Sequence, residues 1–419
     1  MSRDGVADRS HLARRYGTPL YVYDAARIHR AADRLRAALP SPHRLYYSVK
    51  ANPSPAVLRQ LTGLGLPAEV SSAGELAVAL DAGQPAEQVL YTGPGKTPTE
   101  VTEAIAAGVR LFSVESAEDH RRLAALAAEH GTAVGYLIRV NGRPSRPAGG
   151  LRMTGRPSQF GIDLDALWSI PGLFTGTPAA RPVGLHFFPV TNMTDEAALA
   201  AEFTASVETA AAVLHRSGLD ATVLDLGGGF AAPFARPGES PGYQRLAATL
   251  AETLDTRLAG WRAGRPVVAF EAGRYLVAEC GTLLSTVLDV KRSGGRTFVV
   301  LDAGINNLGG VSATGRLLPP SAQPVGPDAP DAEPVTLVGP LCTPLDVLGR
   351  DARLPDPRVG DVVAIPNVGA YGLTASVLGF LSRPPPTEVL VDATDRVVAV
   401  TTWSVRAVEQ PGPAGGAAP

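Results

Sequence analysis

The sequence has few cysteines, no net charge of either sign worth noting and no long apolar run, and each shortage excludes a class of protein. Among its 419 residues the two cysteines, Cys280 and Cys342, are too few and too far apart for a disulfide framework or a cysteine-rich metal site. Lys plus Arg number 38 against 40 for Asp plus Glu, so no overall field favours nucleic acid or a membrane surface. An uninterrupted apolar run of about 18 residues, which would predict a membrane span, does not occur. With a polar start unlike a signal peptide, the chain is expected to be cytoplasmic.

Short apolar strands alternate with Ala-, Leu- and Glu-rich helical stretches from residue 44 onward. The expected strands are Arg44–Lys50, Ala68–Ser71, Gln88–Thr92, Arg110–Val114, Ala133–Val140, Pro182–Phe188, Ala221–Leu226 and Pro266–Phe270. Strand–helix steps of this number and length predict an α/β fold of the (β/α)₈ barrel type, which typically takes roughly 250 residues. A doubly wound open sheet is the alternative, but it would normally need fewer strands.

The pattern changes near Cys280. The strands expected after it are short, β-branched and separated by turns: Val287–Lys291, Thr297–Leu301, Val335–Val338, Asp361–Ile365, Glu388–Val391 and Val397–Thr402. We therefore expect four parts. Residues 1–30 form an N-terminal segment that joins the β domain, residues 31–280 the barrel, residues 281–405 a C-terminal mostly β domain, and residues 406–419 a disordered tail.

Polar residues and glycines follow the expected barrel strands, at the face where barrel enzymes carry their active sites. These positions are Lys50, Glu69, Arg139, His186–Phe188, Gly227–Gly229 and Glu271–Arg274. A lysine beside apolar walls is expected to lose its proton easily, which suits a Schiff base. A lysine that extends into solvent is the alternative for Lys50.

Three further features suggest what this rim binds. Gly227–Gly229 frees backbone N–H groups for an anion beyond strand seven, and without a Walker or Rossmann motif a small phosphate is favoured over a nucleotide. Glu271 ends an apolar strand and needs a cationic partner, either a pyridinium nitrogen or Arg274. Cys342 lies among Gly and Pro residues, which favours a loop thiol that donates a proton over a buried one.

Taken together, these motifs resemble the fold-type III pyridoxal-phosphate decarboxylases, the diaminopimelate and ornithine decarboxylase family. The similarity runs from Tyr16–Tyr23 through Glu69–Glu75 to Gly369–Tyr371 and about Val391. It implies an alanine-racemase-like barrel with a β domain, pyridoxal 5'-phosphate as cofactor, no metal, and a homodimer with shared active sites. Glu271, where alanine racemases place an arginine, favours decarboxylation over racemisation.

The resemblance also implies residue roles. Lys50 forms the Schiff base, and the partner subunit's Cys342 protonates the α-carbon of the quinonoid left by CO₂. The implied cofactor contacts are Lys50, Glu69, Arg139, Phe188, Thr191, Gly228, Gly229, Glu271, Gly273, Arg274 and Tyr371. The implied substrate contacts are Arg274, Arg316, Thr343 and Asp346.

Two departures bear on the substrate. Phe188 stands where the family has a histidine stacked on the cofactor, and Thr343 where relatives acting on diamino acids have an acid. Threonine cannot neutralise a distal ammonium, and residues 302–316 look more like the biosynthetic branch acting on carrier-bound or conjugated amino acids. Arg143, Arg146, Arg152 and Arg156 then form either a strip that docks an acidic acyl carrier protein or a solvated loop. A free amino acid decarboxylase of the diaminopimelate or ornithine type and a catalytically silent homologue are the alternatives.

Overall fold

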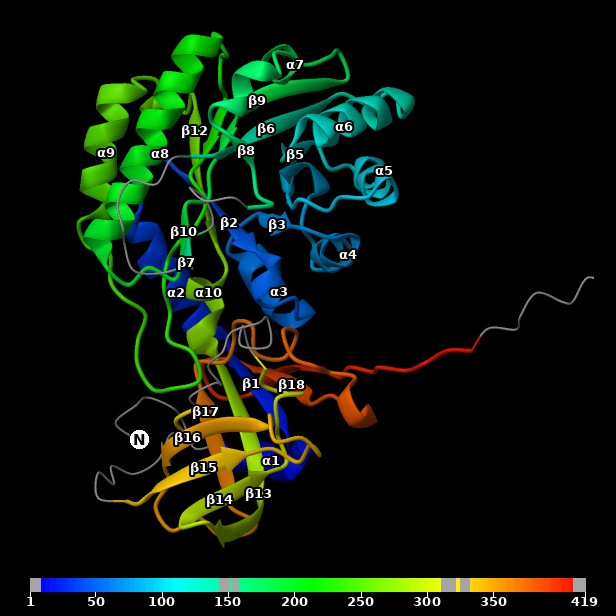
Figure 1. Cartoon of the computed structure of the whole chain (residues 1–419), viewed down its shortest axis with the longest axis vertical. Coiled ribbons are helices and arrows are strands. Elements are labelled where there is room, and N and C mark those ends of the chain that lie inside the picture. Colours follow the sequence, from blue (N-terminus) through cyan, green and yellow to red (C-terminus); the bar gives the residue numbers. More distant parts are fainter. Residues whose placement is uncertain (1–8, 143–150, 153–157, 310–321, 325–331, 410–419) are drawn as a thin grey trace, which may run out of the picture.

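A computed structural model describes residues 9–142, 151–152, 158–309, 322–324 and 332–409. It shows two bodies stacked along the long axis of the molecule, a barrel wrapped in helices and a domain of β-sheet (Figure 1). Residues 402–409 run as coil away from the β domain. The tail from residue 410 onward lies outside the described residues.

Eight parallel strands form the barrel, and the prediction of a (β/α)₈ fold is confirmed. Neighbouring strands pair in the order β5-β4-β3-β2-β12-β11-β9-β6, and β5 also pairs with β6, which closes the sheet. Their bounds are β2 Arg44–Ser48, β3 Ala68–Val70, β4 Leu90–Tyr91, β5 Leu111–Val114, β6 Val134–Asn141, β9 Ala180–His186, β11 Val223–Asp225 and β12 Val267–Ala272. Each lies within two residues of an expected strand, because continuous apolar runs mark strands that are buried on both faces.

Helices follow the strands and cover the barrel (Figure 1). They are α2 Ala25–Ala38, α3 Pro55–Gly63, α4 Ala73–Asp81, α5 Pro98–Ala107, α6 Ala117–Glu129, α7 Gly172–Thr175, α8 Glu196–Ser217, α9 Leu246–Arg257 and α10 Arg274–Val277. Five of them begin at a residue whose side-chain oxygen accepts a backbone N–H of the first turn, namely Asp24, Ser72, Thr97, Ser116 and Asp195. Such caps fix where each helix starts and therefore the length of the loop that precedes it.

Helix α8 is, among the described residues, the one helix long and apolar enough to cross a membrane. Its buried residues, including Leu199, Phe203 and Val207, belong to the hydrophobic core of the barrel. The helix also packs along α9. Its apolar composition is explained by this covering role.

The β domain is built around one long strand, β13 (Gly281–Ser293), that leaves the barrel after α10. The sheet has the order β16-β15-β14-β13-β1-β18-β19, and β17 also pairs with β13. The remaining bounds are β1 Leu20–Asp24, β14 Arg296–Leu301, β15 Pro334–Val338, β16 Val347–Arg353, β17 Val362–Pro366, β18 Thr387–Val391 and β19 Val397–Thr401. Strand β1, preceded by the short helix α1 (Ser10–Tyr16), pairs antiparallel with β13 and parallel with β18. The N-terminal segment thus supplies an inner strand of this sheet.

Strand β16 was not predicted from the sequence. Among the described strands it pairs only with β15, at the edge of the sheet, and its Arg350, Asp351 and Arg353 reach solvent. Charged residues are common on edge strands, where they discourage pairing with other chains. They also hide the alternation by which inner strands are recognised in a sequence.

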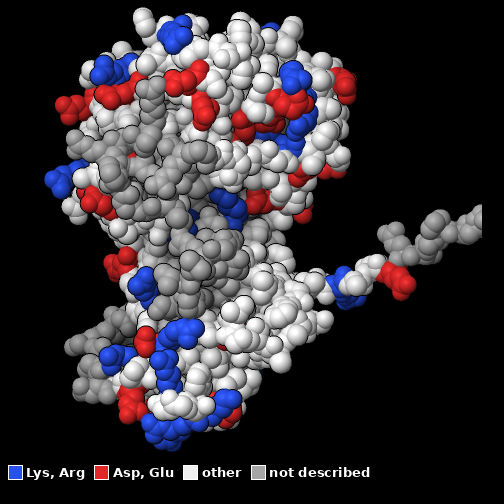
Figure 2. Space-filling view, viewed as in Figure 1, with Lys and Arg blue, Asp and Glu red and all other residues white. Residues whose placement is uncertain are grey.

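Acidic and basic side chains are interspersed over the face of the barrel seen in Figure 2. Among the described residues on this face, no patch of a single sign dominates, in agreement with the near-balance of charges in the sequence.

Candidate active site

Lys50 and Glu69 meet at the carboxyl ends of two neighbouring strands. Lys50 lies in a short 3₁₀ turn, Val49–Ala51, directly after β2, and Glu69 lies in β3. The Lys50 Nζ is 3.3 Å from Glu69 Oε2, and the side chains are 41% and 1% exposed, respectively. Glu69 is fixed because it also accepts hydrogen bonds from the hydroxyls of Ser71 and Thr92. The amine therefore reaches into the barrel mouth over an immobile carboxylate.

The expectation that Lys50 loses its proton easily is wrong for this structure. Desolvation lowers the pKa of Lys50, but the carboxylates of Glu69 and Glu271 raise it more, so the net pKa lies above the ordinary value. The neighbouring apolar residues along the sequence suggested apolar walls. The fold instead brings two acids from β3 and β12 to the amine.

Arg139, at the end of β6, lies beneath the aromatic residues of the site. Its Nη1 is 2.7 Å from Glu115 Oε1, and its guanidinium carbon is 5.0 Å from the ring centroid of Phe160 and 5.9 Å from that of Phe188. The other oxygen of Glu115 accepts the Gly161 N–H at 2.7 Å. Glu115 therefore ties the Ser158–Gly161 segment to the barrel and positions Arg139 at the same time.

Phe188 packs against the glycine turn after β11. A Cβ atom at Gly228 would lie 2.6 Å from the Glu271 carbonyl oxygen and 3.1 Å from Phe188 Cζ, so this position admits only glycine. The Phe188 ring centroid is also 5.6 Å from Lys50 Nζ. A flat ligand bound to Lys50 would therefore meet the Phe188 ring.

The segment that carries Thr191 runs beside the same turn. Thr191 belongs to the short strand β10 (Val190–Thr191), and Met193 N donates to the Gly229 carbonyl at 2.8 Å. Strand β10 pairs with β7 (Leu151–Arg152). The glycine turn, Thr191 and the backbone of Leu151–Arg152 thus lie together.

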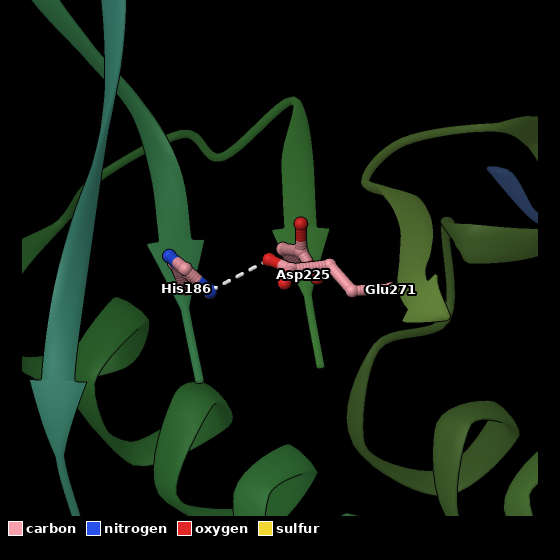
Figure 3. A group of neighbouring side chains, drawn as sticks. All are labelled: His186, Asp225 and Glu271. Carbon is pink, nitrogen blue, oxygen red and sulfur yellow. Dashed lines mark ion pairs between the residues drawn. The ribbon is translucent and has the colours of Figure 1, made fainter. Parts of the chain in front are cut away.

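His186, Asp225 and Glu271 converge beneath this rim from three adjacent strands (Figure 3). His186 and Asp225 are opposite each other in the β9–β11 register, and Glu271 lies two residues beyond Ala269, the partner of Asp225. Residues two apart on a strand share a face. Their ligand atoms therefore lie within 4.8 Å of one another, and all three side chains are buried.

Several buried polar atoms of this group have no well-directed hydrogen-bond partner in the described structure: His186 Nε2, Asp225 Oδ2, Glu271 Oε1 and Arg139 Nε. Unsatisfied buried groups are rare in native proteins, and a cluster of them marks a place for a ligand. A pyridoxal phosphate fits these residues, with an amine for its aldehyde, a glycine turn for its phosphate and a carboxylate for its ring nitrogen. A divalent cation would also accept His186, Asp225 and Glu271 as donors, but the charges of Lys50 and Arg139 already act on Glu271 and oppose it.

Gly273, Arg274 and Tyr371 connect the two bodies beside the site. A Cβ at Gly273 would lie 2.8 Å from Ala51 Cβ, because β12 ends tightly against the Lys50 turn. The Arg274 guanidinium carbon lies 4.9 Å from the Tyr371 ring centroid, and Tyr371 N donates to the Ala51 carbonyl at 2.8 Å. Tyr371 of the β domain is thus anchored to the turn that carries Lys50.

Cys342 and Thr343 lie on the loop between β15 and β16, and Cys342 is exposed. Thr343 lines a depression with apolar residues, including Ile305, Leu345 and Phe380. Asp346 is buried, and its two oxygens accept the N–H groups of Ile305 and Leu341 at 2.8 and 2.7 Å. Asp346 therefore shapes the Cys342 loop, and a direct substrate contact for it stays a prediction.

The remaining expected residues lie outside what the structure describes. Arg143, Arg146, Arg156 and Arg316 fall in ranges without described placement, and for Arg152 only the backbone is described. Ser113, Glu115 and Asp225 also belong to the site and were not predicted from the sequence. Asp225 stands directly before Leu226-Gly227 at a strand end, a position that could have drawn attention to it.

The family model for the pyridoxal-binding domain of the pyridoxal-dependent decarboxylases matches residues 25–278. The chain belongs to this family. The L-glutamyl-[BtrI acyl-carrier protein] decarboxylase of Niallia circulans is 32% identical over 92% of this chain and 91% of its own. The 2-[(L-alanin-3-ylcarbamoyl)methyl]-2-hydroxybutanedioate decarboxylase of Staphylococcus aureus is 29% identical over 87% and 92%, respectively.

Among solved structures, the diaminopimelate decarboxylase of Helicobacter pylori complexed with L-lysine superposes with a TM-score of 0.81. It is 26% identical and covers 93% of this chain and 95% of that chain. The predicted cofactor, pyridoxal phosphate, and the predicted enzyme class, a pyridoxal-phosphate-dependent amino acid decarboxylase, are confirmed by these comparisons.

Proposed function

We propose that this decarboxylase removes the α-carboxylate of an amino acid that is tethered to an acyl carrier protein or conjugated to a larger acid. The observation that carries the proposal is the position of Thr343, which follows Cys342 in the sequence and lines an apolar depression. The distal ammonium of a free diamino acid would lose its hydration there without gaining a carboxylate. An uncharged tether or amide meets no such cost.

The names of the two curated relatives point in the same direction. One acts on a glutamyl group carried by an acyl carrier protein and the other on a citrate-like amide conjugate of alanine, neither of which presents a free distal ammonium group. Backbone pairing of β7 with β10 brings the middle of the arginine-containing segment beside Thr191. The arginines that flank this strand in the sequence would suit an acidic carrier protein that delivers its cargo at the barrel mouth.

The chain's own residues would bind the cofactor and supply the proton. Bound pyridoxal phosphate supplies the electron sink for the carbanion. Lys50 would hold the cofactor, Gly228, Gly229 and Thr191 its phosphate, Phe188 one face of its ring, and Glu271 its nitrogen. Arg139 supports Phe188 from below at 5.9 Å. The partner subunit's Cys342 would give its Sγ proton to the α-carbon after CO₂ leaves.

Exposed apolar side chains near the Cys342 loop support a homodimer. Leu345, Leu381 and Phe380 are 75%, 50% and 41% exposed. Apolar surface of this kind gathered around one loop is typical of a protein interface. A second copy that covered it would bring Cys342 into a site shared by the two subunits, in the cytoplasm that the sequence predicts.

The test is a mass-spectrometric assay of the purified protein with pyridoxal phosphate and matched substrates. Each candidate amino acid is offered free and as its acyl-carrier-protein thioester. We expect loss of 44 Da from a carrier-bound or conjugated amino acid, and turnover at least about 10²-fold slower with free ornithine or diaminopimelate, since an unmatched buried charge costs several kcal/mol.

Lys50→Ala serves as the control, because it removes the amine and should abolish the visible absorbance band that lysine-bound pyridoxal phosphate acquires. Efficient turnover of a free diamino acid would refute the proposed substrate class. A band without turnover of any substrate would instead indicate a silent homologue.

A further inference from the structure

His186 links two groups of the site from a fully buried position at the end of β9. Its Nδ1 lies 2.7 Å from the hydroxyl oxygen of Ser113, and its Nε2 lies 2.9 Å from Glu271 Oε1 (Figure 3). The Nε2 contact is at ion-pair distance but lacks the alignment of a well-formed hydrogen bond. Such contacts in ligand-free sites often tighten when the ligand arrives.

The chemistry of the two neighbours fixes the tautomer of the ring. A neutral imidazole has one donor nitrogen and one acceptor nitrogen, an ionised carboxylate only accepts, and a serine hydroxyl can donate. The arrangement that satisfies all three groups places the proton on Nε2, facing Glu271, while Ser113 donates to Nδ1. Proton placement on Nδ1 would leave two lone pairs facing each other at 2.9 Å.

Asp225 imposes a second condition. It is fully buried, its Oδ1 accepts the Gly227 N–H at 2.8 Å, and its Oδ2 has no hydrogen-bond partner in the described structure. Two ionised carboxylates within 4.8 Å, away from water, repel each other strongly, so one of them keeps a proton. Burial raises the pKa of Glu271, but the positive charges of Lys50 and Arg139 oppose that rise. For Asp225, burial and then the charge of Glu271 raise the pKa well above the ordinary value, so Glu271 is the better placed of the two to ionise.

We propose that His186 is a positioning residue: as a neutral imidazole protonated on Nε2, it selects Glu271 as the ionised carboxylate of the pair and aims it at the cofactor nitrogen. The proposal rests on the assignment of Glu271 to that nitrogen in the proposed function. Asp225 then remains a neutral acid, so a single negative charge faces a single pyridinium. Two ionised acids would leave one buried charge uncompensated.

The surroundings keep His186 neutral. Burial, with a smaller contribution from the charge of Arg139, lowers its pKa to about 3 against the opposing effect of Glu115 and Glu69. The charged or titratable groups that face it are Arg139, Lys50, Glu115, Glu69, Asp225 and Glu271. A protonated His186 would itself pair with Glu271 and compete with the pyridinium, which would weaken the electron sink.

The first test uses the wild-type protein without cofactor, labelled with ¹⁵N in its histidine rings. The chain has seven histidines, and the His186→Gln variant identifies the resonances of His186 by their loss. We expect one protonated and one unprotonated nitrogen, with the proton on Nε2, unchanged from about pH 5.5 to 8.5, since a lowered pKa keeps the ring neutral there. A doubly protonated ring, or a proton on Nδ1, would overturn the proposal.

Because this measurement needs no cofactor, its failure is distinct from failure of the proposed function, which the absorbance band of lysine-bound cofactor reports. A second test compares His186→Gln, which keeps a donor for Glu271, with His186→Leu, which does not. We expect His186→Leu to weaken pyridoxal phosphate binding about 10–100-fold and His186→Gln to recover most of that loss. Equal affinities of the two variants would contradict a positioning role.

His120 provides the matched control. His120 lies on α6 and is also a buried histidine whose pKa is lowered by burial. Its ring centroid is 4.9 Å from that of Tyr136, and its Nε2 has no hydrogen-bond partner among the described residues. His120→Leu removes a similar ring away from Glu271. We expect it to change thermal stability and leave cofactor affinity as in the wild type.

Discussion

The group His186, Asp225 and Glu271 beneath the rim, here called the floor of the barrel, differs from the Cys342 loop in burial and in how it is held. In the floor, His186, Asp225 and Glu271 are buried and held in register by adjacent parallel strands. Cys342 is exposed on a loop of the β domain, and its position depends on Asp346, which holds the loop through two backbone N–H groups. The part expected to hold the cofactor is thus complete within one chain, whereas the part expected to deliver the proton is presented outward.

This difference matches the two tasks. Groups that stabilise charge act best when they are fixed before the reaction and shielded from water. A proton donor has to approach the α-carbon only after CO₂ has left, and a loop that belongs to a second subunit can supply it without crowding the substrate. Substitutions in the floor should therefore affect the rate through charge, and substitutions in the loop through the protonation step or the stability of the loop.

The largest effect is expected for Glu271→Gln. The substitution keeps the size of the side chain and removes its negative charge, so the proposed counter-ion of the ring nitrogen is lost. We expect kcat to fall about 10²–10³-fold while the cofactor still binds, the range found when one preorganised electrostatic contact is removed. Steady-state kinetics with the accepted substrate measure this, and an unchanged kcat would mean that Glu271 does not serve the reaction.

Replacement of the loop thiol should have a smaller and different effect. For Cys342→Ala we expect a fall in kcat of about 10²-fold, the contribution of a general acid, and product with altered stereochemistry of deuterium at the α-carbon in D₂O. Cys280, buried directly before β13, is the control, and Cys280→Ala should keep both rate and stereochemistry. If Cys342→Ala gave product with unchanged stereochemistry, another group would be the donor.

Asp346 allows a test of how the loop is held. Asp346→Ala leaves the buried N–H group of Leu341 and the partly buried one of Ile305 without acceptors, which should lower the free energy of unfolding by about 2–4 kcal/mol. Urea denaturation measures the change. Asp392 also accepts backbone N–H groups, from Thr394 and Arg396 in the β18–β19 turn, but it is more exposed. Asp392→Ala should cost less and spare activity, and equal losses in the two variants would refute the special role of Asp346.

The sequence predicts which residues lie at the barrel mouth better than it predicts their chemistry. Lys50, Glu69, Arg139 and Glu271 could be placed on one rim because each follows an apolar strand, and strands of a barrel end at a common face. The raised pKa of Lys50 could not be predicted, because it depends on acids that are 19 and 221 residues away along the chain and are neighbours only through strand pairing. The hydrogen bond from Ile305 to Asp346 likewise joins residues 41 apart.

The smallest effect concerns two glutamates at the same position of neighbouring helices. Glu75 and Glu100 each stand third in a helix, α4 and α5, that begins at a Ser or Thr cap. Burial, with a further contribution from Glu69, raises the pKa of Glu75 to about 7, whereas hydrogen bonds from Thr97 lower that of Glu100. The position in the helix is identical, so the opposite directions arise from the site beside α4.

The two shifts predict opposite pH dependences of stability. A carboxyl group whose pKa is raised in the folded protein stabilises the fold at low pH, and this contribution is lost as pH rises from about 4.5 through 7. A carboxyl group whose pKa is lowered stabilises the fold above about pH 4.5, and that contribution is lost on acidification. Glu75→Gln should therefore remove a decline in unfolding free energy of about 1–2 kcal/mol between pH 5 and 8. The introduced amide retains an acceptor for the Ser71 N–H that Glu75 binds at 2.7 Å, so the helix start is preserved. Glu100→Gln, the matched variant, should leave that decline in place. If both variants showed the wild-type slope, burial and the charge of Glu69 would not raise the pKa of Glu75 as the structure indicates.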